Sequence, residues 1–139
     1  MVAQRRKSGM TREESYAAAW RIITDVNPFP ATLGRICPHP CENHCNRSEL
    51  DEPLAINAME RFLGDFGIEA GLPLPRNRKR KCVEWVGVVG AGPSGLSFAY
   101  QMARRGYRVT VYDAREKAGG MLRYGVPDYR LPQDVLDAE

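Results

Sequence analysis

The sequence contains little cysteine, with four residues in 139 and none among residues 1 to 30. Three of the four fall within residues 37 to 45. So sparse and clustered a set argues against a disulfide framework and favours metal or redox chemistry in a reducing compartment. An apolar signal-peptide core is also lacking at the N-terminus, where the chain runs directly into the basic stretch QRRK. We therefore expect a cytoplasmic protein.

Long apolar runs are lacking as well. The uncharged window 85–103 is as long as a membrane span, but glycines at four positions, a proline and polar side chains interrupt it, so we expect no membrane segment. The net charge of +3 comes largely from QRRK at 4–7 and RNRKRK at 76–81. Because no aromatic residues are interleaved with these basic runs, we interpret RNRKRK as a solvated linker and expect no nucleic-acid partner.

The first half of the chain has the pattern of two helices. Thr11 to Glu14 has the form of a capping box, and a stripe of apolar residues then predicts a helix over about 12–26. Prolines at 28 and 30 end it. A second apolar stripe predicts a helix over about 54–70, which Gly71 and Pro73 terminate.

Between these helices, Cys37, Cys41 and Cys45 follow one another at steps of four. The flanking prolines keep Cys37 off any helix, whereas residues 41–45 have room for a single helical turn. Three thiolates with His39 or His44 would satisfy zinc, and the same thiolates would also suit an iron–sulfur cluster. The spacing alone leaves both open. Cys82 stands apart and is interpreted as an unligated thiol.

The second half of the chain has the pattern of a β-turn-α-β unit. A short apolar run at 85–89 leads into the glycine-rich turn 90–95, a helical stretch at 96–105 and an alternating strand at 108–113. Gly90 permits the tight turn, Gly92 lets the backbone approach a pyrophosphate, and Gly95 lets helix and strand pack closely. Asp113, at the end of the second strand, can accept a hydrogen bond from a ribose hydroxyl. This context makes dinucleotide binding the preferred interpretation.

Two long stretches, NPFPATLGRICPHPCENHCNRSELDEPLAINAMERFLGD and VVGAGPSGLSFAYQMARRGYRVTVYDAREKAGGMLRYGVPDYRLP, carry a resemblance to a known family. They resemble the N-terminal region of the glutamate synthase small subunit family, which also includes parts of dihydropyrimidine dehydrogenase and of bifurcating ferredoxin:NADP oxidoreductases. The resemblance implies a helical domain with 4Fe-4S clusters fused to an FAD domain, which NAD(P)H reduces in the full-length family. The glycine pair after Asp113 resembles flavin-binding members and favours FAD.

Carried over to this chain, the resemblance implies a fold of class α + α/β. It comprises a helical iron–sulfur domain (1–75), a basic linker (76–82) and a truncated Rossmann-like FAD domain (83–139). The implied cluster ligands are Cys37, Cys41, Cys45 and Glu60. Glu60 lies at the border of an apolar stripe, so a solvated flank residue is an equal alternative. The implied FAD-binding residues are Gly90, Ala91, Gly92, Pro93, Ser94, Gly95, Asp113, Gly120, Met121 and Arg130.

The chain departs from the family pattern in ways that limit these expectations. Leu33 occupies a position where many relatives have a further cysteine, and residues 1–30 lack the cysteines of a second cluster, so we expect at most one cluster. No second nucleotide-binding turn follows before Glu139, so no NAD(P)H site can be assigned. A βαβ unit with one crossover helix cannot bury both sheet faces, so we expect another redox subunit or a missing C-terminal region to complete it.

Two function classes remain open at this point. The first is part of a flavin and iron–sulfur oxidoreductase that takes hydride from NAD(P)H and relays electrons through a cluster. The second is a non-catalytic relay or docking module of a larger redox complex. No catalytic acid, base or nucleophile is predicted, because the cofactor carries flavin chemistry.

Overall fold

The computed structural model describes residues 9–74 and 82–139. Its backbone divides into two compact units, Met1–Leu72 with Ala138–Glu139, and Pro73–Asp137. The predicted basic linker, apart from Cys82, lies outside the described residues. Within the described ranges, no helix combines the length and the apolar character needed to cross a membrane.

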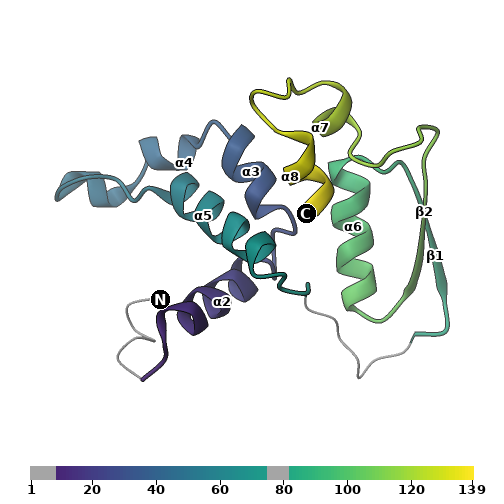
Figure 1. Cartoon of the computed structure of the whole chain (residues 1–139), viewed down its shortest axis with the longest axis horizontal. Coiled ribbons are helices and arrows are strands. Elements are labelled where there is room, and N and C mark those ends of the chain that lie inside the picture. The colour runs from purple at the N-terminus through teal and green to yellow at the C-terminus, as the bar shows by residue number, and fades with distance from the viewer. Residues whose placement is uncertain (1–8, 75–81) are drawn as a thin grey trace. The chain divides into compact units, whose positions relative to one another are not determined.

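The first unit is helical, as the sequence predicts (Figure 1). Its predicted capping box is present, because the Glu14 N–H donates to Thr11 Oγ1 at 3.2 Å and the Thr11 N–H donates to Glu14 Oε2 at 2.8 Å. These two bonds satisfy donors that a helix start otherwise leaves unpaired. The elements are α2 (Arg12–Ile23), α3 (Pro30–Ile36), α4 (Pro40–Asn43), the 3-10 helix η1 (Asn46–Glu49) and α5 (Ile56–Glu69).

Two predictions for this unit need correction. Helix α2 ends at Ile23 rather than near residue 26. Just after the helix end, the Thr24 hydroxyl donates to the Trp20 carbonyl at 2.9 Å. Val26, which was predicted on the helix, is 78% exposed. Helix α3 was not predicted, because the prolines at 28 and 30 were interpreted only as a stop. Pro30 in fact occupies the first turn of α3, where its missing N–H costs nothing and its fixed φ favours the helix.

Helices α3 and α5 lie side by side and touch backbone to backbone (Figure 1). A Cβ atom added at Gly34 would lie 2.5 Å from the Cα of Arg61, and one added at Gly64 would overlap the backbone of Ala31. Only glycine permits so close an approach. The two contacts also show that α3 and α5 run antiparallel, because three residues forward on one helix correspond to three residues back on the other.

Glycine also lets α5 pack against α2. A Cβ atom at Gly67 would overlap the Trp20 indole, which is 5% exposed. The apolar stripe predicted on α5 is less buried than expected, with Met59 and Phe62 each 50% exposed. The close helix contacts at these positions are therefore made by glycines. A pattern of apolar side chains in the sequence cannot reveal such contacts.

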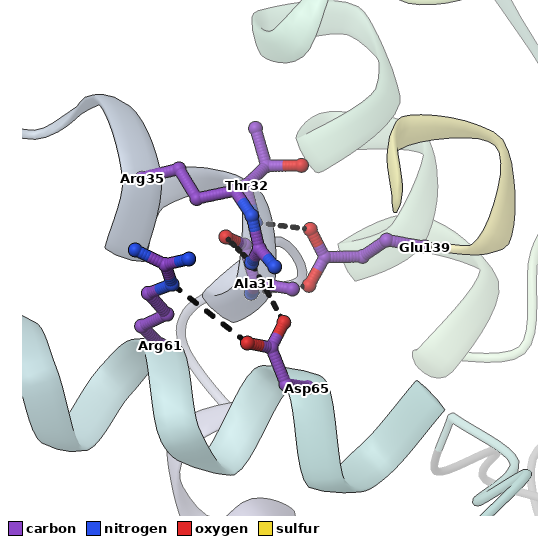
Figure 2. Close-up of polar contacts among 6 residues, drawn as sticks. All are labelled: Ala31, Thr32, Arg35, Arg61, Asp65 and Glu139. Carbon is purple, nitrogen blue, oxygen red and sulfur yellow. Dashed lines mark hydrogen bonds and ion pairs between the residues drawn. The ribbon is translucent and has the colours of Figure 1, made fainter. Parts of the chain in front are cut away.

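An ion pair joins α3 and α5 beside the glycine contact. The Arg35 guanidinium lies 2.6 Å from Asp65 Oδ1, and Arg61 Nε lies 3.8 Å from the other carboxylate oxygen (Figure 2). The Arg35 side chain is only 11% exposed, so this pair is better shielded from water than an ordinary surface pair.

Glu139, which clusters with the first unit, binds the start of α3. Its carboxylate oxygens accept hydrogen bonds from the backbone N–H of Ala31 at 2.6 Å and of Thr32 at 2.8 Å (Figure 2). These N–H groups have no partner within the helix, so the carboxylate satisfies them. Burial raises the pKa of the Glu139 carboxyl, and the hydrogen bonds oppose that shift.

The second unit is the predicted β-turn-α-β. Strands β1 (Trp85–Val89) and β2 (Arg108–Tyr112) pair in parallel, with Trp85 opposite Arg108 and Val89 opposite Tyr112. Helix α6 (Pro93–Arg104) connects the strands and packs on both of them (Figure 1). The unit also contains the short helix α7 (Met121–Tyr124) and all of α8 (Gln133–Ala138) except its last residue. Val89 is 92% exposed and Trp85 71%, so apolar side chains of β1 remain open to solvent in this unit.

We expect Gly64→Ala to destabilise the first unit by about 1–3 kcal/mol, because the added methyl group meets the backbone of Ala31, which cannot move without separating the helices. The better helix propensity of alanine, worth about 1 kcal/mol, offsets only part of this cost. Urea denaturation followed by circular dichroism measures the change. Glu69→Ala, at the exposed end of α5, is the control and should change little. Equal midpoints for Gly64→Ala and the parent would contradict the close packing.

Candidate functional site

Cys37 lies directly after α3, in extended backbone with φ −62° and ψ 131°. The prediction that Cys37 lies outside a helix is therefore confirmed. Its N–H donates to the Leu33 carbonyl at 2.9 Å, which anchors the residue to the last turn of α3. Its Sγ accepts a hydrogen bond from the His39 N–H at 3.3 Å.

The chain then reverses at His39, whose φ of 43° lies in the left-handed region. Helix α4 follows and carries Cys41, which is exposed. The predicted turn over residues 41–45 is shifted, because α4 spans Pro40–Asn43 and Cys45 instead precedes η1. Pro40 explains the shift, since proline favours the first turn of a helix.

The surroundings of Cys45 lower the pKa of its thiol. Backbone N–H groups of Leu54 and Arg47 hold this pKa below its ordinary value. The thiolate form is the one that ligates metals, so this environment favours ligation. An open hollow of about 520 Å³ is lined by residues that follow Cys45 in the sequence, Arg47, Asp51, Glu52, Pro53, Leu54 and Ala55.

The thiols are not preassembled into a ligand cage. In the described ranges 9–74 and 82–139, no group of three or more His, Cys, Asp or Glu side chains is placed to hold a metal ion. The ligand set Cys37, Cys41 and Cys45 therefore stays a prediction. Cys82 belongs to the other unit, where its thiol donates to the Arg105 carbonyl at 3.7 Å.

Glu60 points inward rather than into solvent. Its Oε1 accepts a hydrogen bond of 2.5 Å from the Asn27 side-chain amide, and Asn27 in turn accepts from the Phe29 N–H at 2.9 Å. Burial raises the pKa of the Glu60 carboxyl, and the bond from Asn27 lowers it in part. To serve as the predicted fourth ligand, Glu60 would have to exchange this partner for iron.

The glycine turn of the second unit has the geometry that the sequence predicts. Gly90 has a φ of +99°, which side chains rarely adopt, and Gly92 precedes the first turn of α6. A Cβ atom at Gly95 would overlap the carbonyl oxygen of Gly90, so only glycine allows the helix to approach the strand here. No side chain caps the start of α6, within the part of the chain that the structure describes. Its N–H groups can therefore face a phosphate.

Asp113 lies at this turn. Its Oδ2 accepts from the Ala91 N–H at 2.6 Å and its Oδ1 from the Arg115 N–H at 2.8 Å. These two N–H groups, Ala91 first, lower the pKa of the Asp113 carboxyl. The carboxylate is thus fixed beside the turn where the ribose of a dinucleotide is expected, and each oxygen retains further lone pairs.

The second glycine pair packs against the first turn. The Gly119 N–H donates to the Ala91 carbonyl at 2.8 Å, and a Cβ atom on Gly120 would lie 2.7 Å from the Cα of Gly92. The structure therefore brings Gly120 to the predicted nucleotide turn. Met121 follows and is 71% exposed, while the predicted flavin-lining residue Arg130 is also exposed. Their roles stay predictions.

Two family models match the two units in sequence order. Dihydropyrimidine dehydrogenase domain II, 4Fe-4S cluster, matches residues 9–72, and the NAD(P)-binding Rossmann-like domain matches residues 88–137.

Several relatives are similar over nearly the whole chain. The glutamate synthase (NADPH) small chain of Bacillus subtilis is 39% identical over 88% of this chain and 26% of its own length. The predicted resemblance to the N-terminal region of the glutamate synthase small-subunit family is confirmed. The NADP(+)-dependent formate dehydrogenase subunit beta of Moorella thermoacetica is 38% identical over 92% of this chain and 21% of its own length. The NAD-dependent dihydropyrimidine dehydrogenase subunit PreT of Escherichia coli is 36% identical over 90% of this chain and 31% of its own length.

The chain thus spans between 21% and 31% of the length of these three relatives. Their names describe them as subunits or chains of oxidoreductases. The name of one matched domain model specifies NAD(P), and none of these names mentions FAD.

The cysteine loop suits an iron–sulfur cluster in the chemistry of its donors. Cys37 already accepts an N–H···S hydrogen bond from the His39 backbone, and such bonds stabilise the anionic sulfur of a cluster.

Sequence reasoning missed Glu42, which lies between Cys41 and Cys45. Its Oε1 accepts from the Asn57 N–H at 2.9 Å, in the first turn of α5. Because the residue before α5, Ala55, has no side-chain oxygen, Glu42 acts as the cap of this helix from a distance. The only signal in the sequence was the absence of a capping residue before the second apolar stripe.

We expect Glu42→Ala to destabilise the first unit by about 0.5–2 kcal/mol, the range measured for losing a helix cap. Glu42→Gln retains an oxygen acceptor and should lose less. Urea denaturation measures both, and Glu49→Ala on exposed η1 is the control. A Glu42→Ala midpoint equal to that of Glu49→Ala would show that the bond to Asn57 adds no stability.

We expect the contribution of Asp113 to stability to depend on pH. The folded pKa lies below the unfolded value, so the stabilisation is present above the unfolded pKa, about 4, and is lost as the pH falls through the folded pKa. Asp113→Ala should therefore be less stable than the parent at neutral pH, and the difference should shrink in acid. Urea midpoints across the acidic range test this, with the exposed Glu116→Ala as control. A difference that grows in acid would contradict the assignment.

Proposed function

We propose that this chain is the cluster-binding and flavin-binding part of an NAD(P)H-linked oxidoreductase, and that it relays electrons between FAD and one 4Fe-4S cluster. The observation that carries the proposal is the order of the two matched models on one chain, an iron–sulfur domain followed by a dinucleotide-binding domain. The N–H···S bond at Cys37 supports the cluster half, and the carboxylate of Asp113 at the glycine turn supports the flavin half.

In the first unit, Cys37, Cys41 and Cys45 would hold the cluster and Glu60 would supply a fourth ligand. The thiol of Cys45 is already biased toward its ligating, deprotonated form by backbone N–H groups. Glu60 reaches inward from α5 and is only singly hydrogen-bonded to Asn27 in the contacts that the structure describes. A carboxylate is a harder ligand than a thiolate, so a cluster completed by Glu60 should lose iron more readily.

In the second unit, the turn from Gly90 to Gly95 would hold the pyrophosphate of FAD and Asp113 its ribose. The first-turn N–H groups of α6 and the positive end of its dipole favour the phosphate charge. The backbone of Gly120 packs closely against that of Gly92. Met121 and Arg130 would line the cofactor. When bound, FAD accepts the two electrons of a hydride and releases them singly to an iron–sulfur cluster.

The same proposal includes reduction of the flavin by NAD(P)H and contact with further chain or another redox subunit. The relatives extend well beyond the matched region and are named as subunits. Val89, Trp85 and Tyr112, which are 92%, 71% and 60% exposed, offer an apolar surface on the strands that further chain or another redox subunit would cover.

A panel of single serine substitutions tests the cluster. After anaerobic reconstitution with iron and sulfide, the parent should contain both and absorb in the visible range. Cys37→Ser and Cys41→Ser should abolish this absorption, because each removes a thiolate ligand. Cys45→Ser should weaken or abolish it, and Cys82→Ser is the matched control that should change nothing.

Metal and sulfide analysis decides between this proposal and a zinc site. Stoichiometric zinc without labile sulfide, in protein purified without oxygen, would reject the cluster and leave a structural metal site. Equal loss of absorption in Cys82→Ser would show that the thiols of the loop are not the specific ligands.

A further inference from the structure

Asn57, in the first turn of α5, carries a donor without a partner. Its side-chain Nδ2 is buried, and no acceptor for it lies among the residues that the structure describes. A buried donor left unpaired is costly, because it has lost its hydrogen bonds to water, so nearly all such groups in folded proteins have a partner. The side chain therefore points to an acceptor that is not part of the described polypeptide.

The packing of α3 and α5 places Asn57 at the start of the cysteine loop. The contacts at Gly34 and Gly64 fix an antiparallel register in which three residues forward on α3 match three back on α5. Continuing along α5 from Arg61, which contacts Gly34, leads back toward Asn57 in the first turn of α5, while continuing along α3 leads to its end at Ile36, directly before Cys37. The antiparallel register thus directs the first turn of α5 toward the end of α3, where the loop begins.

A hydrogen bond connects the same turn to the middle of the loop. The Asn57 N–H donates to Oε1 of Glu42, the residue after Cys41, at 2.9 Å. The residue that carries the unpaired amide is therefore bound to the loop beside its second cysteine.

Anionic sulfur is the acceptor that this location would supply. The Cys37 thiol already accepts the His39 backbone N–H at 3.3 Å, so a sulfur of this loop serves as a hydrogen-bond acceptor in the structure. Hydrogen bonds to cluster sulfurs tune the reduction potential, because they stabilise the additional negative charge of the reduced state.

We propose that the Asn57 side-chain amide donates a hydrogen bond to a sulfur of the cluster, either an inorganic sulfide or a cysteine thiolate, and thereby raises its reduction potential. This inference rests on the proposed function, because it needs a cluster on the loop. Asn57 acts here as a positioning and tuning residue and not as a ligand.

The test uses the whole chain, reconstituted anaerobically with iron and sulfide. Asn57→Leu removes the donor at similar size, and Asn57→Gln is a milder variant that retains an amide. Asn46→Leu, on exposed η1 beside Cys45, is the matched control. The readouts are iron and sulfide content, the midpoint potential from a spectroelectrochemical titration, and pulsed EPR of protein labelled with nitrogen-15 in its asparagine side-chain amides.

We expect Asn57→Leu to bind the cluster at a more negative midpoint potential, while Asn46→Leu matches the parent. The labelled parent should show a nitrogen-15 coupling to the reduced cluster, and unlabelled glutamine in Asn57→Gln should remove it. The EPR comparison decides the question even if Asn57→Leu does not fold.

A cluster in the parent without this coupling, and with equal potentials for the two leucine variants, would overturn the role of Asn57 and leave the proposed function intact. A parent chain that takes up no iron and sulfide would overturn both.

Discussion

The backbone contact between α3 and α5 is the constraint on which the first unit depends. At Gly34 on α3 and at Gly64 on α5 there is no room for a Cβ atom. At Gly67, also on α5, the Trp20 indole packs against the backbone. Because the helices touch along their backbones, their register is fixed by shape rather than by interchangeable apolar side chains. The Arg35–Asp65 ion pair lies beside this contact and is partly shielded from water.

The position of the cysteine loop follows from that register. Cys37 begins where α3 ends, and Glu42 caps the start of α5 from within the loop. The backbone N–H of Leu54, just before α5, lowers the pKa of the Cys45 thiol. The cysteine loop is thus anchored at one end by α3 and at the other by α5. Because these helices are packed against each other, the loop can present several thiols to one ligand.

The second unit repeats this use of glycine for another purpose. Gly95 lets α6 approach the turn after β1, and Gly120 lets a later segment approach Gly92. Asp113 then bonds the Ala91 N–H, so the end of β2 is connected to the same turn. Three separate stretches of chain converge where a dinucleotide is expected, and the two glycine contacts exclude any larger residue.

The sequence by itself determined the local structure. The capping box at Thr11, the two strands and the glycine turn all followed from short-range patterns, because caps, pleat alternation and positive φ angles depend on neighbouring residues. Helix α3 was missed since a proline both ends and begins helices, and only packing against α5 decides which.

The tertiary structure alone decided which side chains meet. Glu60 is paired with Asn27, Glu42 with the N–H of Asn57, and Asp113 with the N–H of Ala91, across separations of 33, 15 and 22 residues. No local pattern encodes such pairs. They arise where segments that are distant in the sequence approach closely, and that approach is a property of the folded chain rather than of any segment of it.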